Sequence, residues 1–244
     1  MHNVQNAMFA AAMAFSLGIK LDAIRQGLRT FDSTFFQAPG RMNVFNEHPF
    51  KVLFDYGHNA HAVAAMADLA QRLDVTGRRI VVLAGPGDRR DEDLVAIADA
   101  VAGRFDRYIC RRDDNLRNRA SDEVPKIQAE ALKRAGVPES AIQVIPDEQE
   151  AISAALEMGE PGDLLLIFAD ALVRSWKQIT KFRPTGVAVA HAPVHQDPGA
   201  GATDGAPLPA ALAAFAGDGA MVGQSLEGLI RDERGVRLAP DQED

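Results

Sequence analysis

The sequence predicts an α/β protein with a Rossmann-like, mostly parallel sheet that is covered by helices on both faces. Short apolar runs such as RIVVLAG (79–85) and DLLLIFA (163–169) alternate with amphipathic segments over residues 41–183. Strands that are apolar throughout are typical of parallel sheets buried on both faces, and right-handed crossovers then give a doubly wound domain. A hydrophobic content of 47% over 244 residues allows a core of this size.

The first 40 residues predict two helices and a connector. NVQNAMFAAAMAFSLGI is apolar on most faces, so this helix needs neighbours to cover it, and LDAIRQGL follows with a helical repeat. FDSTFFQAPG (31–40) ends in Pro-Gly and is interpreted as a connector.

The alternating region predicts five strands of one sheet, each followed by a helix. The strands are expected at 51–55, 79–85, 106–111, 141–146 and 163–169, with a short edge strand in MNVFNE (42–47) beside the first. The helices are expected at 60–73, 91–105, 122–136, 148–159 and 171–179. Pro125 leaves the start of the third helix open, because proline disrupts a helix interior.

Residues 184–244 predict a low-complexity, mostly disordered tail. They carry nine acidic residues and three arginines, and their Ala, Gly and Pro content buries too little apolar surface to offset the ordering entropy. PLPAALAAF could be transiently helical, and SLEGLIRDERGVRL could form a weak strand or helix. A docking peptide for a partner is the functional alternative for this tail.

Composition excludes several classes of function. Outside the tail the charges nearly balance and form no basic stripe, which argues against nucleic acid as a partner. Cys110 is the single cysteine, so neither an intrachain disulfide nor a cysteine zinc site is expected, and we predict no metal site. No apolar run is long enough for a bilayer and no signal-peptide pattern is present, so we expect a cytoplasmic protein without a membrane partner.

Polar groups gather after the predicted strands, where open α/β sheets bind ligands. The stretches are DYGHNAH (55–61), GPGDRRD (85–91), RDDNLRNR (112–119) and ADALVRS (169–175). The sheet topology is expected to bring them to one edge. Solvated loops with surface salt bridges are the alternative interpretation.

The residue types in these stretches suit nucleotide and amino-acid ligands. Asp55 could accept two ribose hydroxyls, His58 and Asn59 could contact phosphate or carboxylate, and Arg41 offers a guanidinium after Pro-Gly. The two later loops carry both signs of charge, which suits a zwitterion such as an amino acid. Their cations are Arg89, Arg90, Arg117 and Arg119, and their acids are Asp88, Asp91, Asp113 and Asp114.

Residues 2–183 resemble the Mur ligase superfamily. In that family, the end of the central domain and the start of the C-terminal domain are similar to three stretches of this sequence: HNVQNAMFAAAMAFSLGI, GRMNVF and VLFDYGHNAHAV. The C-terminal part of cyanophycin synthetases resembles two further stretches, GPGDRRDEDL and RRDDNLRNR. The resemblance implies a remnant of the central domain with its linker at 1–40, the C-terminal domain at 41–183, and the tail at 184–244.

The resemblance also implies an ATP-dependent ligase that adds arginine to the aspartate side chains of an aspartate-rich polymer. By this resemblance, Asn3 and Asn6 match positions that approach the adenine of ATP, and His2 lies beside them. Arg41 matches the arginine that reaches the ATP phosphates. Asp55 matches the acid that binds the ribose, and His58 and Asn59 lie in the same sequence block. The loops facing the incoming amino acid correspond to Asp88, Arg89, Arg90, Asp113, Asp114, Asn115 and Arg117. The arginines of these loops could instead contact the acidic polymer.

The sequence departs from the family in its phosphate-binding parts. No G-x-x-G-K-[ST] loop occurs, and the family's magnesium ligands, modified lysine and ATP-grasp module are not found. Because phosphoryl transfer depends on positioning and charge neutralisation, we expect ATP and Mg²⁺ to need upstream ligase domains or a separate chain, and the chain alone to be inactive. A fragment, a split-gene product and a degenerate paralogue all remain open, as does self-association through the apolar first helix.

A non-catalytic protein that binds an amino acid, a nucleotide or a partner is the alternative function. A different dinucleotide-binding enzyme is disfavoured, because no strand–GxGxxG–helix unit is present.

Overall fold

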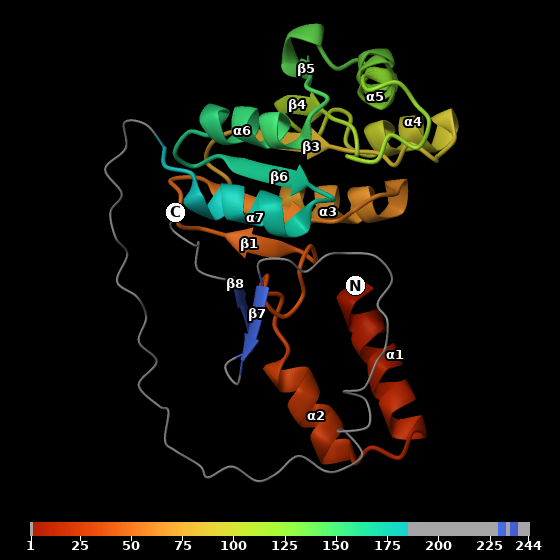
Figure 1. The fold of residues 1–244 in the computed structure, drawn as a ribbon, viewed down its shortest axis with the longest axis vertical. Helices are drawn as coiled ribbons and strands as arrows, with labels where there is room; N and C mark the ends of the chain where they lie inside the picture. The colour runs from red at the N-terminus through yellow and green to blue at the C-terminus, as the bar shows by residue number, and fades with distance from the viewer. Residues whose placement is uncertain (1, 185–228, 233–234, 239–244) are drawn as a thin grey trace.

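The computed structural model describes residues 2–184, 229–232 and 235–238. Its main sheet has six strands in the order β1-β2-β6-β3-β4-β5 (Figure 1). All neighbours pair in parallel except β1, which is antiparallel to β2. The strands are β1 (Asn43–Phe45), β2 (Lys51–Asp55), β3 (Arg79–Leu83), β4 (Arg107–Cys110), β5 (Ile142–Val144) and β6 (Leu164–Phe168).

Helices cover both faces of the sheet, which confirms the predicted fold class. One face packs against α3, α4 and α5, and the other packs against α6 and α7 (Figure 1). Alternate residues of β6 enter the two cores, with Leu166 on the first face and Ile167 on the second. These helices are α3 (Ala60–Arg72), α4 (Asp91–Asp99), α5 (Glu123–Arg134), α6 (Glu148–Met158) and α7 (Leu172–Lys181).

The end of α4 differs from its predicted position, and the start of α5, left open by the sequence, lies close to the predicted one. α4 ends at Asp99 instead of 105, and the chain turns at Gly103 with φ 71° while Val101 and Phe105 still enter the core. α5 begins at Glu123 although Pro125 follows two residues later. Proline is tolerated there because the first-turn N–H groups of a helix have no intrahelical acceptor.

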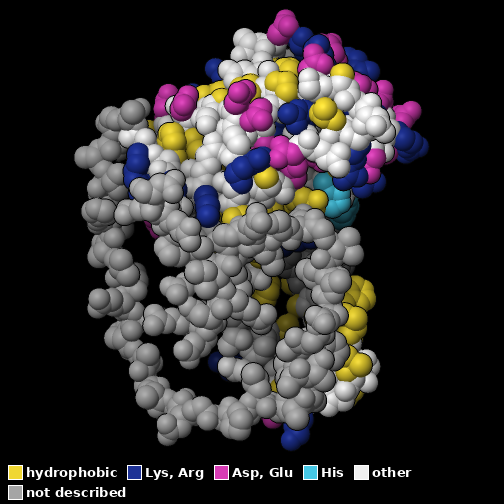
Figure 2. All heavy atoms as spheres, in the orientation of Figure 1, with side chains coloured by type: hydrophobic (Ala, Val, Ile, Leu, Met, Phe, Trp, Pro, Cys, Tyr) yellow, Lys and Arg dark blue, Asp and Glu magenta, His cyan; other side chains and the backbone are white. Residues whose placement is uncertain are grey.

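The N-terminal helices α1 (His2–Ser16) and α2 (Leu21–Thr30) pack against each other and lie below the sheet in Figure 1. Large apolar side chains of α1 remain uncovered, and Figure 2 shows hydrophobic side chains along this helix. Val4, Met8, Phe9, Met13 and Phe15 are each at least 63% exposed.

The connector after α2 is fixed to the sheet domain. The Phe35 ring, 2% exposed, stacks on Trp176 of α7 with centroids 4.8 Å apart. Buried Asn43 donates through Nδ2 to the carbonyls of Ser33 (2.8 Å) and Ala38 (2.9 Å), and its Oδ1 accepts the Gly40 N–H at 2.8 Å. Residues 33–40 therefore hold the turn that presents Arg41.

Most of the predicted disordered tail lies outside the described residues. Within it, β7 (Leu229–Asp232) and β8 (Gly235–Leu238) form an antiparallel pair, in the segment for which a weak strand was one alternative. No helix among the described residues is long and apolar enough to cross a membrane.

Candidate functional site

Four loops meet at the carboxyl edge of the sheet, as the strand pattern predicts. We call this edge the rim; it comprises the loops after β2 (56–59), β3 (84–90), β4 (111–122) and β6 (169–171), whose strands are neighbours in the sheet. In Figure 2, basic, acidic and histidine side chains are interspersed over this part of the surface. One small depression draws its lining from all four loops: Tyr56, Gly57, His58, Ala84, Pro86, Arg111, Asp113, Ala169 and Asp170.

Asp55 at the end of β2 is engaged with backbone. It is 8% exposed, and its Oδ2 accepts the N–H of Met42 at 2.8 Å, which holds Met42 at a φ of 53°. Burial raises the pKa of Asp55, although hydrogen bonds from Met42 and Gly57 and the nearby Arg41 charge oppose the rise. Asp55 thus shapes the turn that carries exposed Arg41.

The other residues predicted to bind nucleotide differ in their hydrogen bonds and in their position in the fold. Asn59 is the N-cap of α3, where its Oδ1 accepts the Ala62 N–H at 2.9 Å. His58 Nδ1 lies 3.2 Å from the Tyr56 carbonyl, which assigns the proton to Nδ1 and leaves Nε2 as an acceptor in the neutral ring. Asn3 and Asn6 lie on α1, and Asn6 is exposed.

The loops after β3 and β4 touch at backbone level. A Cβ added to Gly87 would lie 2.4 Å from the Leu116 carbonyl oxygen. Arg119 fastens the contact, donating through Nε to the Gly87 carbonyl (2.8 Å) and through Nη2 to the Arg89 carbonyl (2.7 Å). Arg117, at a φ of 48°, forms an ion pair with Asp88 across the same junction.

We expect Gly87→Ala to lower the free energy of unfolding by about 1–3 kcal/mol, because the new methyl group would force the two loops apart. Gly27→Ala is the matched control: no atom lies within 4 Å of its added Cβ, and alanine favours the interior of α2. Urea titrations of both variants check this, and a Gly87→Ala protein as stable as the parent would contradict the close approach.

Several of the predicted amino-acid contacts are ion-paired within the protein. Arg90 forms a two-point pair with Asp93 at 3.1 Å, and Asp114 pairs with Arg174 at 2.6 Å. The Asn115 Oδ1 accepts the backbone N–H of Arg117 at 3.1 Å. The surface salt-bridge interpretation therefore accounts for part of this charge. Among the described residues, no ion pair involves Arg89 or the Asp113 carboxylate.

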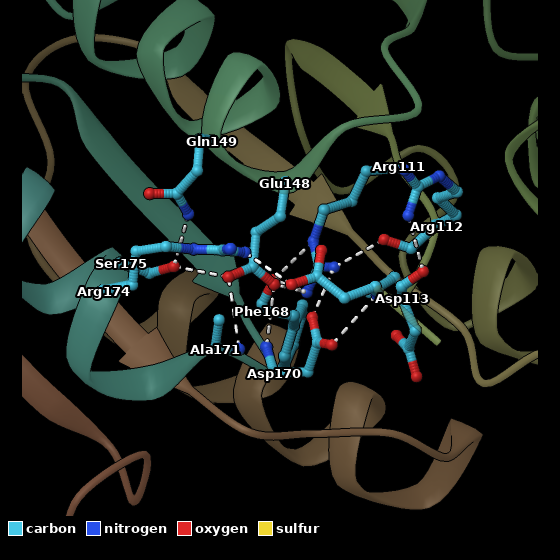
Figure 3. A network of polar contacts seen from close by, with 12 residues as sticks. Arg111, Arg112, Asp113, Glu148, Gln149, Phe168, Asp170, Ala171, Arg174 and Ser175 are labelled. Atoms are coloured by element: carbon cyan, nitrogen blue, oxygen red, sulfur yellow. Dashed lines mark hydrogen bonds and ion pairs between the residues drawn. The ribbon is translucent and has the colours of Figure 1, made fainter. Parts of the chain in front are cut away.

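A buried ion cluster lies beneath the rim (Figure 3). Arg111 at the end of β4 is fully buried; its Nη2 lies 2.9 Å from Glu148 Oε2 and its Nη1 lies 2.8 Å from Asp170 Oδ1. Its Nε and Nη2 also donate to the Phe168 carbonyl at 3.2 and 2.9 Å, and Nη1 donates to the Arg112 carbonyl at 2.7 Å. We call Arg111, Glu148 and Asp170 the buried triad.

The two acids of the buried triad respond differently to their surroundings. Burial raises the pKa of Glu148 to about 7, against the attraction of Arg111. Burial also opposes the charge on Asp170, but hydrogen bonding to Glu148 and the Arg111 charge outweigh it and lower the pKa of Asp170 to about 2. Apart from the Asp170 carboxylate, each described hydrogen-bond partner of Glu148 donates to it.

Asp113 is a rim carboxylate whose surroundings disfavour its charged form. Burial, followed by repulsion from Asp170, raises its pKa to about 6, while Arg111, Arg117 and His58 oppose the rise. In the part of the chain that the structure describes, no group donates a hydrogen bond to this carboxylate, and Figure 3 draws none. A perturbed carboxylate in a depression is typical of a ligand-binding position.

We expect Asp113→Asn to raise the free energy of unfolding at pH 8 by about 1–2 kcal/mol. The folded-state pKa of Asp113 lies above its unfolded value, so its stabilising contribution is complete below about pH 4 and is lost as the pH rises through about 6. Urea titrations from pH 4 to 8 check this; a difference between variant and parent that does not change with pH would contradict it.

A sequence profile of the family described as "Mur ligase, glutamate ligase domain" matches residues 40–171, which contain the whole rim. The chain belongs to the Mur ligase family. Relatives include cyanophycin synthetases of Synechocystis sp. (36% identical over 183 residues, 75% of this chain and 21% of that protein) and Geminocystis herdmanii (37% over 179 residues, 73% and 20%). This chain spans about a fifth of the length of these relatives.

A solved Mur ligase relative has the same fold. A pseudomurein peptide ligase type C from Methanothermus fervidus superposes with a TM-score of 0.53 at 26% identity, over 74% of this chain and 36% of that one. The predicted resemblance is confirmed: this is a cyanophycin synthetase-like Mur ligase C-terminal domain, in a family of ATP-dependent ligases.

Sequence reasoning missed the buried triad of this Mur ligase domain. Arg111 and Asp170 stand directly after apolar strands, so an ionisable residue at a strand end was the available signal. Glu148 gave no such signal, because an acid in the first turn of a helix is common. Only the tertiary structure brings the three together.

Proposed function

We propose that this chain forms the amino-acid-binding part of a cytoplasmic, ATP-dependent amide ligase of the cyanophycin synthetase type, and that its rim accepts arginine. The observation that carries the proposal is the open Asp113 carboxylate, in the same set of loops as Arg89 and Arg117. A guanidinium needs a carboxylate partner, and a ligand carboxylate needs a cation. The printed names of the cyanophycin synthetase relatives support the same reaction class.

The nucleotide would meet the rim beside β2. Exposed Arg41 is our choice for the ATP phosphates and Asp55 for the ribose, with His58 and Asn59 alongside. Among the described residues no group of three metal-ligating side chains occurs, and the sequence lacks the G-x-x-G-K-[ST] phosphate loop. Any Mg²⁺ would be held by other ligase parts.

Titration of the chain with L-arginine tests the proposal. Binding should be weak and should shift the amide NMR signals of residues 85–91 and 113–119. Asp113→Ala and Arg117→Ala should each weaken binding about tenfold, since each removes one charged partner of the ligand. Arg25→Ala, which removes an exposed cation from α2, is the control and should leave binding unchanged.

An acidic polymer gives a different result. If the loop variants weaken binding of poly-aspartate and leave arginine binding as it was, the loops contact the polymer and the amino-acid assignment is wrong. Binding of neither ligand would overturn the proposal.

A non-catalytic protein that uses the rim to bind an amino acid, a nucleotide or a partner is the second candidate. Both candidates predict that the purified chain does not hydrolyse ATP by itself. A phosphate-release assay with Mg²⁺ checks this, and metal-dependent turnover would contradict both. Adding the ATP-binding parts of a relative in trans separates them, because only the ligase part should then incorporate arginine.

A further inference from the structure

Glu148 is placed where its own helix does not need it. It is the first residue of α6, and the preceding Asp147 already caps this helix, since its Oδ1 accepts the N–H groups of Gln149 (2.8 Å) and Glu150 (3.0 Å). Glu148 is nevertheless fully buried, which is rare for glutamate. Its carboxylate therefore serves another part of the molecule.

The Glu148 carboxylate holds the loop after β6. Its Oε2 accepts the Asp170 N–H at 2.9 Å and its Oε1 accepts the Ala171 N–H at 3.2 Å. The Ser175 hydroxyl of α7 donates to Oε1 as well, and Ser175 is itself held by Gln149 Nε2 at 3.0 Å. Figure 3 shows these contacts converging on one carboxylate.

The buried triad connects this loop to the loop after β4. β3 lies between β6 and β4 in the sheet, so Arg111 reaches past the end of β3 to bind both Glu148 and Asp170. Asp170 completes the connection through Oδ2, which accepts the backbone N–H of Asp114 at 3.2 Å. Two loops from non-adjacent strands thus share one set of charged hydrogen bonds.

Stability alone is a poor reason to bury these charges. Removing an ion triad from water costs several kcal/mol per ion, and well-packed apolar residues often replace such clusters without loss. What the triad provides is fixed geometry, because each bond is directional and every donor group of Arg111 has a partner.

We propose that Glu148 is a positioning residue: through Arg111 and Asp170 it sets the relative position of the β6–α7 and β4–α5 loops, and so the geometry of the amino-acid pocket. The link to an amino-acid pocket rests on the function proposed above; the link between the loops does not. Glu148 itself need not touch the ligand.

A matched variant makes the proposal testable. Asp163 lies at the opposite end of β6 and is 3% exposed. Like Glu148, its carboxylate binds one arginine side chain and two backbone N–H groups. The partners are Arg78 Nη2 (2.8 Å) and the N–H groups of Arg78 (2.6 Å) and Glu160 (3.0 Å). Glu148→Gln and Asp163→Asn therefore remove equivalent charges at the two ends of one strand.

Amide hydrogen exchange gives the first measurement. Relative to the slowest core amides, Glu148→Gln should speed exchange at Asp114, Asp170 and Ala171 by about tenfold or more, whereas Asp163→Asn should change these amides only as much as it changes the core. Equal effects of the two variants at these amides, or no local effect of Glu148→Gln, would overturn the proposal. If Glu148→Gln does not fold, Ser175→Ala removes one donor, and it should speed exchange at Asp170 and Ala171.

Arginine affinity gives the second measurement. Glu148→Gln should weaken L-arginine binding about tenfold, because small displacements of the side chains that bind a ligand lower its affinity. Asp163→Asn should leave the affinity within about twofold of the parent. Unchanged affinity in Glu148→Gln would overturn the link to the pocket. If the parent chain binds no arginine, the proposed function fails, and the exchange rates still decide whether Glu148 couples the two loops.

Discussion

Arg111→Ala is expected to lower the free energy of unfolding by about 3–5 kcal/mol at pH 8, the range for removing one partner of a buried ion pair. The change would leave the carboxylates of Glu148 and Asp170 without their shared cation, and Glu148 is fully buried. It would also remove two donors from the Phe168 carbonyl at the end of β6.

The loss should shrink at low pH, and the sign follows from the pKa of Glu148, which burial raises to about 7. An unpaired carboxylate destabilises the fold while it is ionised, so the penalty is present above its folded-state pKa and disappears as the pH falls toward its unfolded value. Urea titrations of the variant and the parent at pH 8 and pH 5 measure the loss of stability and its decrease at low pH.

Arg90→Ala is the control for Arg111→Ala. Arg90 pairs with Asp93 on the surface, and exposed pairs contribute at most about 1 kcal/mol. If Arg111→Ala costs no more than Arg90→Ala, the buried triad does not hold the rim together.

Phe35→Ala should cost about 3–5 kcal/mol, as for other buried aromatic side chains. The Phe35 ring is 2% exposed, stacks on Trp176 at an interplanar angle of 2° and lies 6.1 Å from the Phe54 ring of β2. Its removal would leave a cavity where the connector, the sheet and α7 meet.

Phe36→Ala supplies the matched control, since the neighbouring ring is 41% exposed and its removal should cost about 1 kcal/mol or less. Thermal or urea unfolding of both variants checks the prediction. It also bears on the predicted division at residue 40: equal, small effects would mean that residues 31–40 are only a linker, whereas a large effect of Phe35→Ala would make them part of the sheet domain.

Most of the sheet could be read from the sequence because its strands are apolar on both faces. RIVVLAG and DLLLIFA have no polar side that could face water, so they had to become central strands with helices on either side. Ends of elements were less predictable: α4 ends six residues before 105, because the chain turns at Gly103 while Phe105 still packs in the core.

The site could be predicted only in part. Parallel strands end at one edge, so the polar loops after β2, β3, β4 and β6 were expected to meet, and they do. The sequence could not show which charged side chains pair within the protein and which stay free to contact a ligand. Arg90 turns back to Asp93 and Asp114 pairs with Arg174, whereas the Asp113 carboxylate remains open toward the depression.

The sequence by itself determined the fold class, the family and the edge of the sheet at which the polar loops gather, because hydrophobic periodicity and short motifs are local properties of the chain. The tertiary structure alone decided which charges are buried together. Glu148 and Arg111 are 37 residues apart in the sequence, and no local pattern connects them. They meet because Arg111 at the end of β4 reaches past β3 to the end of β6, where the first turn of α6 places Glu148.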